Sequence, residues 1–122
     1  MKRDMELVRN LLLEIERHPE AYAPVAIEVP GYQKDMIGYH LALLLDAGLI
    51  EGSAGMIMGQ KYPRVKVKRL TWAGHEFLEA AREDTRWKSA MTVVKEKGGA
   101  ITFEVLRALL VSLMKTAVGL EP

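Results

Sequence analysis

The segment Gly31–Ile50, GYQKDMIGYHLALLLDAGLI, constrains the fold of this 122-residue chain more than any other. Its apolar residues recur at the spacing of three and four that places side chains on one helical face: Ile37, Leu41 and Leu44. Gly48 stands where a helix ends in a left-handed residue, a conformation that glycine adopts without a Cβ penalty. The segment therefore predicts a helix that begins near Gln33, ends at Gly48 and continues into an extended segment.

A basic hairpin is predicted after this helix. The stretch 53–60 holds two glycines around Met-Ile-Met and is typical of a hairpin tip, and no acidic residue occurs between Glu51 and Glu76. The strand expected over 61–69 carries five cations, which are Lys61, Arg64, Lys66, Lys68 and Arg69. Val65 and Val67 alternate with lysines, as in a half-buried strand. The cations either contact nucleic-acid phosphates or protect an edge strand from aggregation, and the sequence favours the two interpretations equally.

A helix, a glycine stop, a short strand and a charged hairpin follow one another as in the second half of a winged helix. The residues His40-Leu41-x-x-Leu44-x-x-Ala47-Gly48-Leu49-Ile50 resemble the end of the recognition helix in small bacterial winged-helix regulators. That resemblance implies a helix that lies in the DNA major groove. The residues that it would present there include Gln33, Lys34 and Tyr39.

The same helical face also carries Asp35, Gly38 and Ala42, which are poor base-reading residues. They favour a second hypothesis, in which a winged-helix scaffold has lost DNA binding and serves as a protein–protein interaction module.

Four further helices and one short strand are predicted from periodicity and capping residues. Arg3–Arg17 is an amphipathic helix that Pro19 ends. Thr71 is a good N-cap for a helix that reaches about Arg82 and buries Trp72 as a core anchor. The other expected elements are a strand at Ala26–Val29, a helix at Arg86–Lys97 capped by Thr85, and a helix at Phe103–Val118 capped by Thr102.

The last helix is apolar on most of its sides, and such a helix must be covered on more than one face. Either it packs centrally within the chain or a second copy covers it. We favour a homodimer, with an interface at Leu106, Leu109, Leu110, Leu113 and Met114.

The composition indicates the cellular compartment of the protein and excludes disulfide bonds. The chain has no cysteine, so it forms no disulfide and fits a reducing compartment. The first residues lack a signal-peptide core, and no apolar run approaches the roughly 20 residues that span a bilayer. We expect a cytoplasmic protein that does not enter the membrane.

Catalysis and metal binding are not expected. His75-Glu76-x-x-Glu79 faintly resembles a zinc-protease helix, but the second histidine is missing. No nucleophile–base pair or phosphate loop is visible, so we predict no enzyme, no metal and no cofactor.

The phrases MKRDMELVRNLLLEIE, GYHLALLLDAGLIEG, LTWAGHEFLEAARED and GGAITFEVLRALLVSLMKTAVGL together resemble a family of small phage and prophage proteins of unknown function. The resemblance implies a winged-helix-like domain over 1–84 and a C-terminal helical extension over 85–122, which packs on it or mediates oligomerisation. The predicted fold class is mainly α with a small β-sheet (α+β). The predicted function is DNA binding of a regulatory type.

Overall fold

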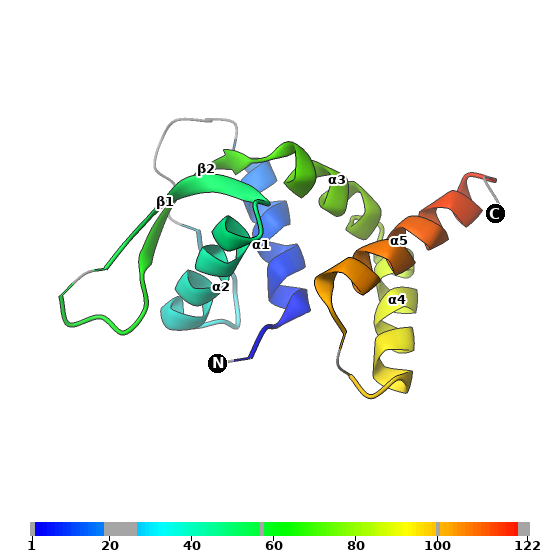
Figure 1. Ribbon diagram of the computed structural model, residues 1–122, viewed down its shortest axis with the longest axis horizontal. Helices are drawn as coiled ribbons and strands as arrows, with labels where there is room; N and C mark the ends of the chain where they lie inside the picture. The colour runs from blue at the N-terminus through cyan, green and yellow to red at the C-terminus, as the bar shows by residue number, and fades with distance from the viewer. Residues whose placement is uncertain (1, 19–26, 57, 100, 120–122) are drawn as a thin grey trace. The chain divides into compact units, whose positions relative to one another are not determined.

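The computed structural model of the protein describes residues 2–18, 27–56, 58–99 and 101–119. In these residues it contains five helices and one two-stranded antiparallel sheet (Figure 1). The elements are α1 (Met5–Arg17), α2 (Lys34–Asp46), β1 (Ile50–Gly55), β2 (Arg64–Leu70), α3 (Trp72–Ala81), α4 (Asp84–Glu96) and α5 (Phe103–Ala117). The prediction of a mainly helical chain with a small sheet is therefore confirmed.

The chain divides into two compact units, Met1–His75 and Glu76–Pro122, with the division inside α3. The strand predicted at Ala26–Val29 is wrong where it can be judged. Residues 27–29 are irregular, and the backbone N–H of Tyr32 donates to the carbonyl of Val29 in a turn. Residue 26 lies outside the described residues.

Helix α1 begins at a side-chain cap and buries one stripe. Asp4 is the N-cap, and its Oδ1 accepts a hydrogen bond from the backbone N–H of Leu7 at 3.2 Å. The buried residues follow the helical period: Leu7, Val8, Leu11, Leu12 and Ile15. This stripe packs α1 against α2 and β2 in the first unit.

Helix α2 has a weak start and a strong end. Gln33 occupies the N-cap position without a side-chain hydrogen bond to the helix. At the other end Gly48 has φ of +74°, its N–H donates to Leu45, and the N–H of Leu49 donates to Leu44, each at 3.0 Å. These two hydrogen bonds form a Schellman motif. The predicted glycine stop is confirmed.

A buried histidine joins α2 to the beginning of α1. The His40 side chain is fully buried. Its Nε2 accepts a hydrogen bond from the backbone N–H of Asp4 at 2.8 Å, and its Nδ1 lies 2.9 Å from the carbonyl oxygen of Met36. Because Nε2 accepts, Nδ1 carries the hydrogen and donates to Met36. His40 thus holds two helices together.

The sheet is a single hairpin with a bulge near its base. Ile50 pairs with Leu70 and Gly55 with Arg64, but the register shifts between Glu51 and Gly52. Glu51 faces Arg69 and Gly52 faces Val67, which leaves Lys68 as the extra residue of β2. Both strands contact α2, and β2 also contacts α1.

The start of α3 is fixed to the end of α2. Thr71 Oγ1 accepts a hydrogen bond from the N–H of Gly74 at 3.1 Å and donates to the carbonyl of Gly48 at 2.5 Å. The predicted N-cap is confirmed, but Trp72 is 80% exposed and the prediction of a core anchor is wrong. The buried face of α3 contains Gly74, Phe77, Leu78 and Ala81. Trp72 precedes Gly74 by two residues, or about 200° of helical rotation, and so points the opposite way.

In the second unit, Glu83 caps α4 in place of the predicted Thr85. Its carboxylate accepts hydrogen bonds from the N–H groups of Thr85 at 2.9 Å and Arg86 at 2.8 Å, and these bonds hold the pKa of Glu83 below its usual value. A carboxylate at this position also suits the positive end of the helix dipole. Arg86 Nε donates to the carbonyl of Ala80 at 2.8 Å, which ties α4 to the end of α3.

Helices α4 and α5 pack together. Gly98 and Gly99 both have positive φ and end α4 as predicted, and Thr102 caps α5 through the N–H of Val105 at 3.3 Å. The core of this pair consists of Trp87, Ala90, Val94, Leu106 and Leu110.

Gly74 generates a stability prediction, because a Cβ at this residue would overlap the backbone carbonyl oxygen of Leu49. We expect Gly74→Ala to lower the free energy of unfolding by about 1–3 kcal/mol, the usual cost of an overpacked site. Urea denaturation measures the change. Gly55→Ala is the matched control, because a Cβ there meets nothing within 4 Å and should cost less than about 1 kcal/mol. Equal stabilities for the two variants would contradict the prediction.

Candidate nucleic-acid interface

The cations of the hairpin fall into two groups. Within the described residues, Lys61, Arg64, Lys66 and Lys68 have no carboxylate partner, and all four are exposed. Arg69 is different, because its Nη2 lies 2.6 Å from Glu51 Oε1 and its Nη1 donates to the carbonyl of Leu70 at 3.0 Å. Arg69 therefore links the two strands at the base of the hairpin.

Arg64 and Lys66 share one face of the ribbon. They alternate with Val65 and Val67, and Val67 is only 2% exposed. Because successive side chains of a strand point to opposite faces, Arg64 and Lys66 point away from the face that carries the two valines. Their partners on β1 are Gly55 and Ser53. No bulky neighbour across the ladder screens these cations, which with Lys68 are called the ribbon cations below.

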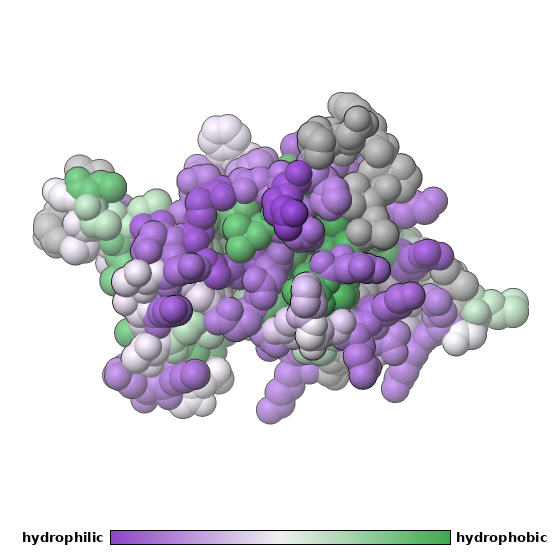
Figure 2. All heavy atoms as spheres, turned by 180° about the vertical axis from the view of Figure 1, so that it is seen from behind, coloured by the Kyte–Doolittle hydropathy of each residue, from purple (hydrophilic) through white to green (hydrophobic). Residues whose placement is uncertain are grey.

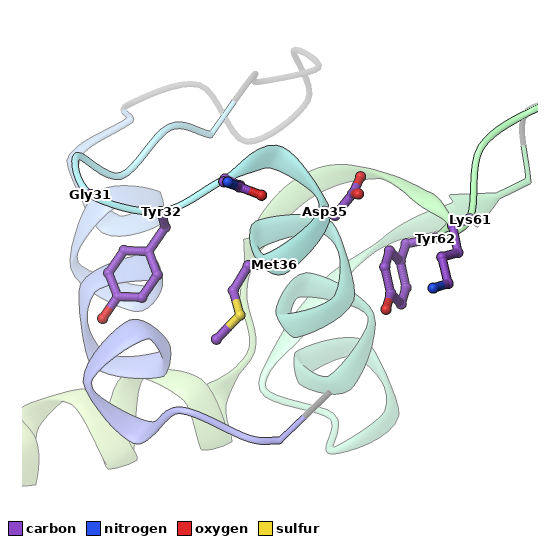
Figure 3. Close-up of a pocket in the computed structure, with 7 residues that line it drawn as sticks. Gly31, Tyr32, Asp35, Met36, Lys61 and Tyr62 are labelled. Carbon is purple, nitrogen blue, oxygen red and sulfur yellow. The ribbon is translucent and has the colours of Figure 1, made fainter.

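A shallow groove of about 370 Å³ lies between the start of α2 and the hairpin (Figure 3). Its lining residues are Gly31, Tyr32, Gln33, Asp35, Met36, Lys61 and Tyr62. In Figure 3 Lys61 and Tyr62 approach from the hairpin side, and Asp35 extends from the first turn of α2. The groove brings together two residues of the predicted DNA-binding set, Gln33 and Lys61. Lys34 is exposed beside them at the first position of α2.

The middle of α2 is in contact with the hairpin. The Tyr39 ring lies edge-on to that of Tyr62 with centroids 5.6 Å apart. An added Cβ at Gly38 would lie 3.1 Å from the carbonyl oxygen of Pro63, closer than a side chain normally approaches. Gly38 is small because the hairpin approaches it, a role that the sequence did not indicate.

The candidate DNA-binding residues fall into two groups. Gln33, Lys34 and Lys61 gather at the start of α2, while the ribbon cations extend from β2. Tyr39 packs on Tyr62. Sequence reasoning missed Tyr32 and Tyr62, and the Tyr-Pro pair directly before the basic strand was the only signal for Tyr62.

Comparison with known proteins assigns the chain to a family. A family model described as hypothetical protein (DUF2513) matches residues 2–100. The chain belongs to this DUF2513 family. A Haemophilus influenzae protein described as uncharacterized is 32% identical over 108 residues, which cover 88% of this chain and 90% of the relative. No solved structure matches the chain.

These findings confirm the resemblance to a family of unknown function. The matched range of the DUF2513 model ends before α5, which begins at Phe103.

Two further observations on this DUF2513 protein bear on other kinds of site. In the part of the chain that the structure describes, no group of three or more His, Asp or Glu side chains is placed to hold a metal ion. Over the same residues, each helix is too short or too polar to cross a bilayer.

The predicted oligomer residues of α5 also separate into two sets. Leu106 and Leu110 are fully buried within the chain. Leu109, Leu113 and Met114 are half-buried and remain accessible to a partner.

The groove generates a prediction about Tyr32. Burial raises the pKa of Tyr32, and the Asp4 carboxylate, whose Oδ2 accepts its hydroxyl at 3.2 Å, raises it further. Protonated Tyr32 therefore contributes to the stability of the folded protein. This contribution is fully present below the ordinary tyrosine pKa of about 10 and is lost as pH rises through the pKa of Tyr32 in the folded state. We expect Asp4→Asn to lower the Tyr32 pKa, because asparagine preserves the helix cap but removes the charge.

An NMR titration of the Tyr32 ring measures this pKa. Tyr32→Phe is the control and should reduce the loss of stability at alkaline pH. An unchanged Tyr32 pKa in Asp4→Asn would contradict the assigned cause.

Proposed function

We propose that this protein binds double-stranded DNA, as a winged-helix-like regulator that performs no catalysis. The observation that carries the proposal is the set of ribbon cations on β2, which are exposed and have no carboxylate partner among the residues that the structure describes. They lie in a segment without acidic residues between Glu51 and Glu76. The resemblance noted above extends the proposal to a phage or prophage origin and to the cytoplasm of a bacterial host.

Edge protection explains the cations less well than DNA binding does. In a two-stranded sheet both strands are edges, so protection from aggregation requires charge on both. Strand β1 carries only Glu51, and Glu51 is engaged by Arg69; the rest of β1 after it is Gly-Ser-Ala-Gly. Charge is thus concentrated on one strand, as a phosphate-binding surface requires.

The proposed contact is made mainly with the DNA backbone. Ribbon cations supply the charge, and Gln33, Lys34 and Lys61 add polar groups at the start of α2. Pro63 and Tyr62 contact the face of α2 that a recognition helix would turn toward bases. Phosphate contacts position a protein on DNA but carry no sequence information directly, so we propose weak sequence preference.

One observation favours the alternative of a protein-interaction module. Trp72 is 80% exposed at the start of α3, and tryptophan is enriched among the residues that dominate protein–protein affinity. In this alternative the partner binds around Trp72 and is retained when the ribbon cations are removed.

Replacement of the ribbon cations tests DNA binding directly. We expect Arg64→Gln/Lys66→Gln to weaken binding to duplexes of any sequence, because phosphate contacts are lost. Each lost contact should also make the negative slope of log K against log salt less steep by about 0.9. Fluorescence anisotropy over a salt series measures the slope. Lys88→Gln/Lys95→Gln on α4 removes two exposed cations elsewhere and should leave the slope unchanged. No binding of duplex DNA by the wild type at low salt, or equal slopes for both variants, would refute the proposal.

We also propose a homodimer through α5. Because Leu106 and Leu110 are already buried, the contact falls on Leu109, Leu113 and Met114. Light scattering at micromolar concentration should give a dimer, and Leu109→Glu/Leu113→Glu should give a monomer, because a charge in an apolar interface is costly. Ser112→Glu, at an exposed position of the same helix, is the control and should remain dimeric. A monomeric wild type would rule out the dimer.

A further inference from the structure

The end of the hairpin carries exposed apolar side chains. Met58 is 100% exposed and Met56 is 65% exposed. Both lie beyond Gly55 and Arg64, the last paired residues of the ladder. In Figure 2 hydrophobic side chains protrude at the end of the hairpin, and hydrophilic side chains lie behind them. Single exposed hydrophobic residues are common, but here two of them share one projecting tip.

Open space surrounds the two glycines that flank the methionines. Gly55 and Gly59 flank them, and neither glycine has an atom within 4 Å of the position where a Cβ would lie. Gly59 has φ of +85° and lies in a turn with Met58. A methionine side chain is unbranched, flexible and polarisable. It can therefore enter a narrow apolar space.

We propose that this tip is a wedge, in which Met58, with Met56 beside it, enters the minor groove of duplex DNA, partly unstacks one base step and bends the duplex. The inference rests on the proposed DNA binding and names its mode. Methionine is among the side chains that minor-groove proteins insert between base steps. The minor groove, about 6 Å wide, accommodates a narrow side chain but not a helix.

The cations behind the tip match a linear polyanion. Lys61 follows Met58 by three residues, so it lies at most about 11 Å behind it along the chain. Arg64 and Lys66 are two residues apart on one face of β2, or about 6.8 Å, which equals two base-pair rises of about 3.4 Å along one DNA strand. An anionic membrane also attracts cations, but it presents no row of charges for a strand to follow. The order of the cations therefore favours DNA.

Binding and bending are measured separately to test the wedge. The variants are Met56→Gln/Met58→Gln, which replaces two exposed apolar side chains by polar ones of similar length, and Lys66→Gln, which removes one ribbon cation. Anisotropy over a salt series reports binding. Energy transfer between dyes at the two ends of a duplex reports bending, and 2-aminopurine fluorescence reports unstacking.

The wedge predicts a different response for each protein. The wild type should shorten the end-to-end distance of the duplex and brighten 2-aminopurine. The methionine variant should bind with the same salt slope, because its cations are intact, but without bending or unstacking. Lys66→Gln should lower the salt slope by about 0.9 and still bend the duplex that it binds.

The contrary outcomes are distinct. A wild type that binds DNA but leaves it straight overturns the wedge alone, as does a methionine variant that bends DNA equally well. A wild type that binds no duplex overturns both the wedge and the proposed function. If the methionine substitutions abolish binding to phosphatidylserine vesicles but leave DNA bending unchanged, the tip is a membrane anchor and the wedge is wrong.

Discussion

The junction of Gly48, Leu49, Thr71 and Gly74 holds both ends of the hairpin at one point, and the first unit depends on it. The N–H of Thr71 donates to the carbonyl of Leu49, and the hydroxyl of Thr71 donates to the carbonyl of Gly48. Gly74 allows α3 to approach the same carbonyl of Leu49 with no side chain between them. Because β1 begins and β2 ends at this junction, the hairpin leaves the helices as an arm with a fixed base.

A second contact supports the arm just before its return strand, β2, begins. Pro63 approaches Gly38, and Tyr62 lies edge-on to Tyr39. Between the base and this contact, the inner side chains of β2 face the helices, as the 2% exposure of Val67 shows. Beyond it, the tip has no comparable packing within the described residues. The arm therefore combines a held stem, whose cations are turned outward, with an uncovered apolar end.

Local rules explain what could be predicted from the sequence. Gly48, Thr71 and Thr102 were assigned correctly, because a C-terminal glycine and a threonine cap act through hydrogen bonds within a few residues. The spacing of apolar residues predicted α1, α2 and β2 correctly, because this spacing also depends only on residues that are close in sequence. Glu83 was missed because threonine is the commoner type of cap, whereas here the carboxylate of Glu83 accepts from the N–H groups of Thr85 and Arg86.

Features set by tertiary contacts could not be predicted in this way. The exposure of Trp72 depends on which face of α3 Gly74 turns to Leu49, and periodicity alone gives no such choice for a short helix. The division of the cationic surface has the same origin. Lys61 precedes the ladder and lies by α2, whereas Arg64 and Lys66 lie within the ladder and take the face opposite the valines. A contiguous run of cations in sequence does not predict a contiguous surface when a strand separates its residues by face.

The small number of cations on the arm bears on the assembly in which DNA would be bound. Lys61, Arg64, Lys66 and Lys68 give one arm at most four phosphate contacts. With four contacts, a single arm falls in the non-specific range, with Kd on the order of 10⁻⁴–10⁻⁶ M.

Two linked arms on one duplex would bind far more tightly, because the second contact becomes intramolecular. A wedge at each tip would add bending without additional charge. The proposed α5 dimer therefore bears on the proposed arm, since a second copy would raise the affinity of the arm for DNA at cellular salt.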